Sequence, residues 1–126
     1  MSQLRVAVIG HRFMGRAHSS AWRQVGRFFP VSRQPVLQVL CGRDRAETER
    51  AAATLGFAEA ATSWEEVVRR PDVDVVDVCT PVALHRPMAV AAAAAGKAVL
   101  CEKPLARDVA EAEEMLAAVR AAGTRR

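Results

Sequence analysis

The sequence predicts an α/β fold of three layers, in which one parallel sheet carries helices on both of its faces. Short β-branched runs alternate along the chain with longer segments that carry helix-capping signals, in the order β-α-β-α-β-α-β-α-β-α. The first run leads into a turn that contains two glycines, Gly10 and Gly15. Strands and helices that alternate in this way are typical of right-handed crossovers in a single parallel sheet.

Short apolar runs define five expected strands, and capped segments between and after them define five helices. The strands are expected over residues 4–10, 36–41, 57–62, 73–79 and 98–102. The helices are expected over residues 14–28, 44–56, 63–70, 86–96 and 108–123. Side-chain oxygens that can accept a hydrogen bond from a free backbone N–H predict three N-caps, which are Asp44, Ser63 and Asp108. Glycines are expected to end three of the helices, at Gly56, Gly96 and Gly123.

Length and composition indicate one globular domain. The chain has 126 residues, of which 51% are hydrophobic and 25% are charged, and these values fit a soluble protein with a folded core. We expect a cytoplasmic protein, because the first residues lack a signal peptide and no apolar run is long enough to span a bilayer. The cysteines Cys41, Cys79 and Cys101 form no C-x-x-C pair, which disfavours a disulfide scaffold or a zinc site.

The net charge of +4 arises from arginines that gather before the first acidic residue, Asp44. A basic N-terminal third is compatible with a phosphate-bearing ligand or a nucleic acid. The plainer interpretation is a solvated face. DNA binding through the helix around residues 18–29 is disfavoured, because no second helix at helix-turn-helix spacing presents a basic face.

The turn after the first strand has the spacing of a dinucleotide-binding loop. Gly10 and Gly15 stand where the pattern G-x-G-x-x-G has its first and third glycines, and Arg12 replaces the second. The N-terminus of the following helix offers N–H groups and a positive dipole end to a pyrophosphate. Arg12 either points away from the phosphates or pairs with them. The candidate cofactor-binding residues here are Gly10, Arg12, Phe13, Met14 and Gly15.

The residues after the second strand bear on the choice between NAD and NADP. An acidic residue at this place binds the ribose 2′-hydroxyl of NAD, whereas this chain has Gly42, Arg43 and only then Asp44. Arg43 is a candidate partner for a 2′-phosphate or the adenine ring, and Asp44 is a candidate cap of the next helix. Both cofactors remain open, with NADP slightly favoured.

Polar and titratable residues follow the fourth and fifth strands, at the sheet edge where open α/β folds bind their ligands. The first group is Thr80, Pro81 and His85, and the second is Glu102, Lys103 and Pro104. His85 alone is more typical of a capping or surface histidine than of a ligand-binding one. Lys103 is one of only two lysines in the chain, and its place at a strand end before a proline favours a functional role.

Three stretches together resemble the N-terminal half of the glucose–fructose oxidoreductase / inositol dehydrogenase family (Gfo/Idh/MocA). They are IGHRFMGRAHSSAW, VDVCTP followed by His85, and AAAAAGKAVLCEKPLA. The resemblance covers residues 4–123, and its most specific motif is Glu-Lys-Pro. It implies a Rossmann domain that binds NAD or NADP and presents the nicotinamide to a sugar, polyol or related substrate.

The resemblance also implies roles for individual residues. Lys103 would contact the substrate hydroxyl and the nicotinamide ribose as a catalytic residue, and Glu102 would anchor that lysine or a ribose hydroxyl. Thr80, Pro81 and His85 would line the nicotinamide side, with His85 as the second catalytic candidate. The bond between Lys103 and Pro104 is often cis in this family, and no metal is implied.

The chain departs from the family pattern in two residues and in length. Arg12 replaces the middle glycine, and Val82 stands where many members have asparagine. Family enzymes continue into a second α/β domain, so the resemblance implies that residues 1–126 are the dinucleotide-binding domain alone, truncated and not competent in hydride transfer by itself. The alternative is a stand-alone nucleotide-binding or sensing module that acts with a separately encoded partner. The exposed surface expected at the fifth strand favours a homo-oligomer or association with the absent domain.

Overall fold

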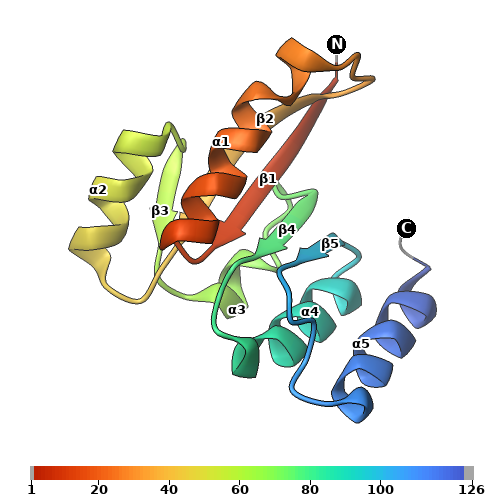
Figure 1. Ribbon diagram of the computed structural model, residues 1–126. Coiled ribbons are helices and arrows are strands. Elements are labelled where there is room, and N and C mark those ends of the chain that lie inside the picture. The colour runs from red at the N-terminus through yellow and green to blue at the C-terminus, as the bar shows by residue number, and fades with distance from the viewer. Residues whose placement is uncertain (1, 124–126) are drawn as a thin grey trace.

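The computed structural model describes residues 2–123, in which five strands form one fully parallel sheet (Figure 1). The strands are β1 (Gln3–Ile9), β2 (Gln34–Cys41), β3 (Glu59–Ala61), β4 (Val75–Val78) and β5 (Ala98–Cys101). The helices are α1 (Phe13–Phe28), α2 (Arg45–Leu55), α3 (Trp64–Val67), α4 (His85–Ala94) and α5 (Val109–Ala122), with a 3₁₀ turn η1 (Val82–Leu84) before α4. The strand order β3-β2-β1-β4-β5 is that of a doubly wound sheet. The predicted Rossmann-like α/β fold is therefore confirmed.

Local capping chemistry accounts for the helix starts that the sequence predicts. The side chains of Asp44, Ser63 and Asp108 each accept a hydrogen bond from the backbone N–H three residues further on. The fourth strand is shorter than predicted and begins at Val75, because Val73 still belongs to a turn in which its N–H donates to the Arg70 carbonyl. The sequence also gives no sign of η1, which precedes a helix that starts one residue earlier than expected.

Alternate strand residues point to opposite faces of the sheet, and different helices cover the two faces. Val6 and Val8 of β1 lie in the core on the side of α1 and α2. Ala7 and Ile9, which alternate with them, lie in the core on the side of α3 and α4. α5 packs against α4 as an outer element of that second side. The three predicted layers follow from this alternation along the central strand.

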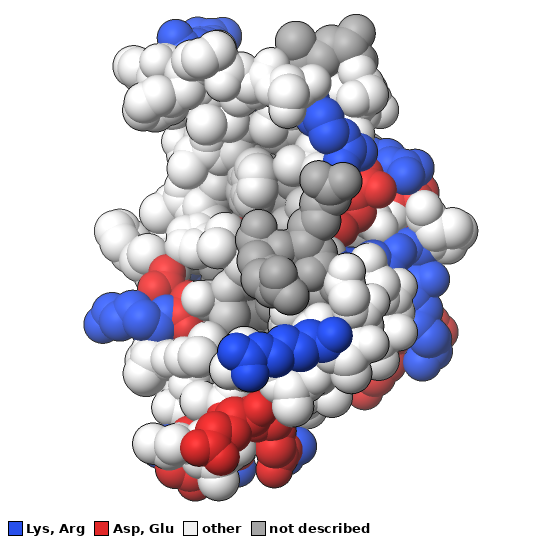
Figure 2. Space-filling view, turned by 90° about the vertical axis from the view of Figure 1, so that its right-hand side faces the viewer, with Lys and Arg blue, Asp and Glu red and all other residues white. Residues whose placement is uncertain are grey.

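The surface around β5 and α5 carries exposed apolar side chains, as the sequence predicts. Within residues 2–123, β5 pairs with β4 alone, and Leu100 on β5 is 44% exposed. Val109 and Leu116 of α5 are also exposed. Figure 2 views the molecule from this side and shows uncharged surface between scattered basic and acidic side chains. Self-association through this surface stays a prediction.

A transmembrane helix needs about 20 predominantly apolar residues. No helix in residues 2–123 combines the length and apolar character that a membrane span requires.

Candidate functional site

The carboxyl ends of the central strands lie level with one another, because the sheet register aligns their last residues. Ile9 of β1 is paired with Cys41 of β2 on one side and with Val78 of β4 on the other. Val78 is in turn paired with Cys101 of β5. The segments that follow these strands therefore meet at one edge of the sheet, and they contain every site residue that the sequence predicts.

Gly10 and Gly15 are required by the close packing of backbone at this edge. Gly10 has a φ of +101°, and a Cβ on it would lie 2.7 Å from the carbonyl oxygen of Cys79. A Cβ on Gly15 would lie only 2.0 Å from the carbonyl oxygen of Gly10. The first glycine therefore lets β1 turn beside the end of β4, and the other lets α1 start directly against that turn.

Arg12 occupies the middle position of the loop without strain. It is the N-cap residue of α1 with φ −80° and ψ −161°, a conformation open to any residue, and its side chain is exposed. The first turn of α1 contains no acidic side chain and no side-chain cap. Phe13 and Met14 begin that turn and are both exposed, Phe13 at 81%. The free N–H groups of this turn and the Arg12 guanidinium thus form an open, positive surface at the helix N-terminus.

The segment after β2 separates the roles that the sequence suggests for Arg43 and Asp44. The Asp44 carboxylate accepts a hydrogen bond from the Glu47 N–H at 2.8 Å and so caps α2, as predicted. Arg43 is exposed beside it at the carboxyl edge. The acidic side chain that follows β2 in the sequence is thus already used in a helix cap, while Arg43 is exposed to solvent.

His11 is a loop residue whose contacts the sequence reasoning missed. Its Nε2 lies 3.3 Å from the hydroxyl of Thr48, which itself donates to the Asp44 carbonyl at 2.6 Å. A Cβ on Gly42 would lie 2.6 Å from the same His11 nitrogen. His11 therefore covers Gly42 and joins the glycine loop to α2. Nothing in the residue pattern marks this contact, because it depends on the pairing of β1 with β2.

His85 is buried, which corrects the expectation of a surface histidine. It is 1% exposed, and its two ring nitrogens lie against backbone carbonyls of the segments after β4 and β5. Nε2 is 2.7 Å from the Thr80 oxygen, and Nδ1 is 2.9 Å from the Pro104 oxygen. The ring is buried because it fills the space between these two segments, and it joins them. Thr80 is half-buried, with its hydroxyl 3.6 Å from the Met88 sulfur, and Pro81 is exposed.

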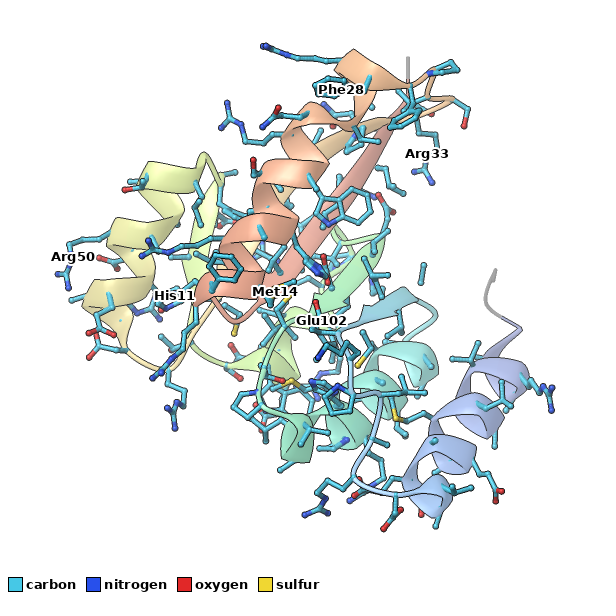
Figure 3. The ribbon with its side chains drawn as sticks, in the orientation of Figure 1. His11, Met14, Phe28, Arg33, Arg50 and Glu102 are labelled. Atoms are coloured by element: carbon cyan, nitrogen blue, oxygen red, sulfur yellow. The ribbon has the colours of Figure 1, made fainter. Side chains whose placement is uncertain are left out.

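The Glu-Lys-Pro segment presents its lysine to solvent at the carboxyl edge. Lys103 is exposed, and the Lys103–Pro104 peptide bond is cis. Glu102 turns back and accepts the Lys103 N–H through Oε1 at 2.8 Å. Figure 3 shows Glu102 at the same end of the sheet as His11 and Met14, whereas Phe28 and Arg33 lie at the opposite end of α1.

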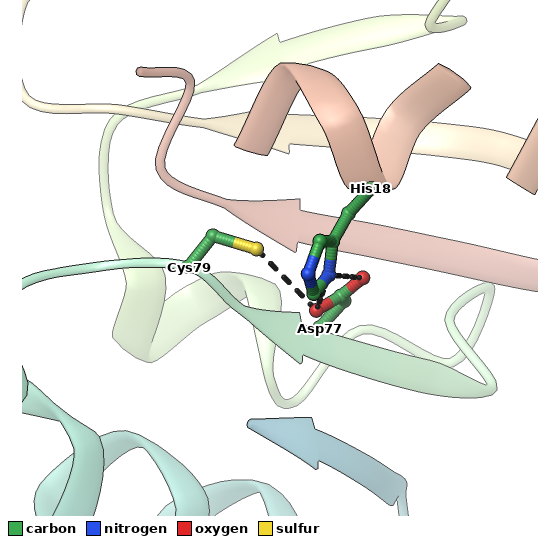
Figure 4. A group of neighbouring side chains, drawn as sticks. All are labelled: His18, Asp77 and Cys79. Carbon is green, nitrogen blue, oxygen red and sulfur yellow. Dashed lines mark hydrogen bonds and ion pairs between the residues drawn. The ribbon is translucent and has the colours of Figure 1, made fainter. Parts of the chain in front are cut away.

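Behind this edge lies a group of polar side chains that the sequence pattern alone did not reveal (Figure 4). Asp77 of β4 is fully buried, and its carboxylate contacts His18 of α1, the Trp22 indole N–H at 2.9 Å and the Cys79 thiol at 3.4 Å. The sequence did contain a sign of it, since Asp77 is an acidic residue inside an apolar strand. Such a residue is buried only when its partners satisfy it.

His18, Asp77 and Cys79 place ligand atoms within 4.8 Å of one another, which is the spacing of a metal site. Each of these atoms already takes part in a hydrogen bond of the group. Burial, and then the Asp77 charge, raises the pKa of the Cys79 thiol. The contacts of these atoms within the described residues are those of a hydrogen-bond network.

The family model described as "Oxidoreductase family, NAD-binding Rossmann fold" (GFO_IDH_MocA) matches residues 4–125. The chain belongs to the Gfo/Idh/MocA oxidoreductase family. This confirms the resemblance carried by the glycine loop, the Thr-Pro pair and Glu-Lys-Pro, because all of these lie inside the match.

Relatives of this Gfo/Idh/MocA chain include dehydrogenases of known structure. Levoglucosan dehydrogenase of Pseudarthrobacter phenanthrenivorans is 41% identical over 121 residues, which are 95% of this chain and 31% of that protein. An oxidoreductase domain protein from Kribbella flavida is 51% identical with a TM-score of 0.94, covering 99% of this chain and 34% of the other. Levoglucosan dehydrogenase in complex with NADH and levoglucosan has a TM-score of 0.94 at 40% identity, covering 98% and 34%. The Gfo/Idh/MocA chain thus spans about a third of the length of these relatives.

Proposed function

We propose that this chain is the nicotinamide-dinucleotide-binding domain of an oxidoreductase that transfers hydride between the cofactor and a hydroxyl group of a sugar or polyol. The observation that carries the proposal is the meeting of the glycine loop and the Lys103 segment at one edge of the sheet, which the strand register imposes. A relative with nearly the same fold is known in complex with NADH and levoglucosan. Hydride transfer itself is proposed for the longer protein, since a substrate must be held against the nicotinamide.

The start of α1 is the proposed binding site for the pyrophosphate. Its first turn has free N–H groups, no acidic side chain and no side-chain cap, and such a terminus attracts an anion. The exposed loop residues Arg12, Phe13 and Met14 surround it, and Gly10 and Gly15 allow the backbone to come close. Thr80 and Pro81, at the end of β4, are proposed to line the nicotinamide side.

Lys103 is the proposed catalytic residue. It is exposed at the carboxyl edge, whereas the other lysine, Lys97, donates from its ammonium group to two backbone carbonyls. An ammonium group close to the nicotinamide stabilises the alkoxide character that develops on a substrate hydroxyl. His85 is proposed to support Lys103 indirectly by holding its segment in place, because the His85 ring contacts the backbone carbonyl of Pro104. Glu102 is proposed to anchor the lysine segment.

The proposal is tested by titration of the 126-residue chain with NADH and NADPH side by side, followed by cofactor fluorescence. We expect saturable binding, with a change in emission as the nicotinamide enters the site. If the chain binds neither NADH nor NADPH at millimolar concentrations, the proposed function is overturned.

Arg12 is proposed to pair with the pyrophosphate, because its exposed guanidinium stands at the helix N-terminus and shows no hydrogen bond or ion pair to the other residues in 2–123. Arg12→Gly is therefore expected to raise the Kd for NADH and NADPH by about 10-fold, the value of one charge-assisted hydrogen bond. Arg12→Lys keeps the charge without the paired donors, so its Kd is expected to lie between those of the unmodified chain and Arg12→Gly. Tighter binding by Arg12→Gly would show instead that the side chain obstructs the loop.

Arg43 is proposed to favour NADPH by pairing with the 2′-phosphate. Arg43→Glu is expected to raise the Kd for NADPH by about 10- to 100-fold and to leave the Kd for NADH nearly unchanged. Arg50→Glu makes the same charge change on the exposed side of α2 and is the matched control (Figure 3). Equal effects of Arg43→Glu on both cofactors would remove Arg43 from the choice between them.

A further inference from the structure

His18 lies between two carboxylates that come from different parts of the chain. Its Nδ1 is 2.9 and 3.0 Å from the two oxygens of Asp77, which belongs to β4. Its Nε2 is 2.8 Å from Oε2 of Glu102, in the segment after β5. The ring thus joins α1 to the centre of the sheet and to the Glu-Lys-Pro segment.

The chemistry of the three groups fixes where the protons are. An ionised carboxylate can only accept a hydrogen bond, so both ring nitrogens of His18 must donate, and the ring must carry its positive charge. The Trp22 indole N–H also donates to the Asp77 carboxylate, so this buried group is hydrogen-bonded from two residues of α1. Burial lowers the pKa of His18, but the hydrogen bonds and charges of Asp77 and Glu102 outweigh burial and raise that pKa above its ordinary value of 6.5.

Glu102 connects the histidine to the proposed catalytic lysine. Oε2 of Glu102 accepts from His18, and Oε1 accepts from the backbone N–H of Lys103 at 2.8 Å. The N–H of Glu102 donates to the Val78 carbonyl at 2.9 Å, which fixes its backbone to the end of β4. The orientation of the Glu102 carboxylate, and with it the start of the Lys103 segment, therefore depends on the His18 ring.

We propose that His18 is a positioning residue, a charged bridge that holds Glu102 so that the Lys103 segment is ordered for the cofactor. The inference rests on the proposed function in one respect, since it assumes that Lys103 faces the dinucleotide. The bridge itself follows from the contacts of His18 with Asp77 and Glu102 alone.

The bridge is expected to open as the pH rises, and it opens on one particular side. A neutral ring keeps one hydrogen, which stays on Nδ1 because Asp77 is fully buried and has no access to water. The Glu102 side chain is 18% exposed and can turn to solvent instead. Loss of the proton from His18 thus releases Glu102 and loosens the Lys103 segment, while the contact with Asp77 remains.

The other titratable groups around the ring are few within the described part of the chain. Cys79 follows β4 and donates to Asp77. Cys101 ends β5, where burial and then the charges of Asp77 and Glu102 raise the pKa of its thiol to about 11. Lys103 lies beyond Glu102, and its backbone N–H together with the His18 ring lowers the pKa of Glu102. The ring is therefore the cation that contacts both carboxylates, and it loses its charge as the pH rises through its raised pKa.

The charge of His18 is tested by NMR on the 126-residue chain, with the nitrogen shifts of the imidazole followed against pH. We expect both ring nitrogens to be protonated at neutral pH and the midpoint of the titration to lie above the ordinary value. Glu102→Gln is expected to lower the midpoint, because the amide can donate to a neutral ring in place of accepting from a charged one. A neutral His18 ring at neutral pH in the unmodified chain would overturn the bridge.

The positioning role is tested by hydrogen exchange of the Lys103 amide, corrected for the intrinsic base-catalysed rate. His18→Gln is expected to speed this exchange by about fivefold at neutral pH, through loss of an ordered acceptor. Glu102→Gln is expected to keep the amide protected into alkaline pH, where the unmodified chain loses protection. His11→Gln makes the same change in the neighbouring loop, where His11 contacts Thr48, and is expected to leave the Lys103 amide unchanged. Unchanged exchange in His18→Gln would overturn the positioning role.

Cofactor titration separates this inference from the proposed function. We expect His18→Gln to raise the Kd for NADH or NADPH by about fivefold. An unchanged Kd in a chain that binds dinucleotide would overturn the positioning of the cofactor site and leave the proposed function intact. Failure of the unmodified chain to bind any dinucleotide would overturn the proposed function, and the NMR titration would still decide the charged bridge.

Discussion

Replacement of Gly15 by alanine is expected to lower the free energy of unfolding by at least about 3 kcal/mol, which puts it among the most damaging single substitutions. The added Cβ would lie 2.0 Å from the carbonyl oxygen of Gly10 and 2.7 Å from its carbonyl carbon. Neither side of this contact can move away. Gly10 is held by a hydrogen bond from its N–H to the Cys41 carbonyl, directly after a central strand that is paired on both sides.

Gly26→Ala provides the matched control in the same helix. There the nearest atom to an added Cβ is Val31 Cγ2 at 3.6 Å, an ordinary contact. Alanine is favoured over glycine inside a helix by about 0.5–1 kcal/mol, so this variant is expected to be slightly more stable than the unmodified chain. Urea denaturation followed by circular dichroism gives both values. A Gly15→Ala chain as stable as the unmodified one would contradict the close packing of loop and helix.

The parts of this protein that could be predicted from its sequence depend on residues near one another in the chain. Asp44 caps its helix by accepting the N–H of Glu47, three residues away, and the same holds for Ser63 and Asp108. The glycine turn is similar, because Gly10 and Gly15 meet each other across five residues. The order of strands and helices then follows from the general rules of parallel sheets.

The parts that could not be predicted depend on which strands are neighbours and in what register. His18 meets Asp77 across 59 residues and Glu102 across 84 residues. Both contacts require β4 to lie between β1 and β5, which no local pattern specifies. The burial of His85 has the same origin, since its ring fills a space that forms only when the segments after β4 and β5 come together.

Replacement of Asp77 by alanine is expected to lower the free energy of unfolding by about 3–5 kcal/mol at mildly acidic pH. The carboxylate is fully buried and accepts from the His18 ring, the Trp22 indole and the Cys79 thiol. Its removal leaves these donors without their acceptor and leaves the charged imidazole, whose side chain is 20% exposed, with Glu102 as its remaining partner. The cost then comes from the His18 Nδ1, indole and thiol donors, because each has lost its acceptor inside the protein.

The loss of unfolding free energy in Asp77→Ala should also depend on pH, in a direction set by the raised pKa of His18. The pKa of His18 is higher in the folded chain than the value of about 6.5 expected when it is unfolded. The charged His18 ring therefore contributes fully to stability below about pH 6.5, and this contribution is lost as the pH rises through the pKa of His18 in the folded chain. The deficit of Asp77→Ala should accordingly be largest near pH 6 and smaller in alkaline solution, where the unmodified chain has lost this contribution too. Asp44→Ala removes an exposed N-cap at a cost of about 1 kcal/mol and should show no such dependence. Only a charged His18 ring makes the buried Asp77 carboxylate more stabilising at low pH. If the loss of unfolding free energy in Asp77→Ala stays constant from mildly acidic to alkaline pH, the ring is therefore neutral throughout.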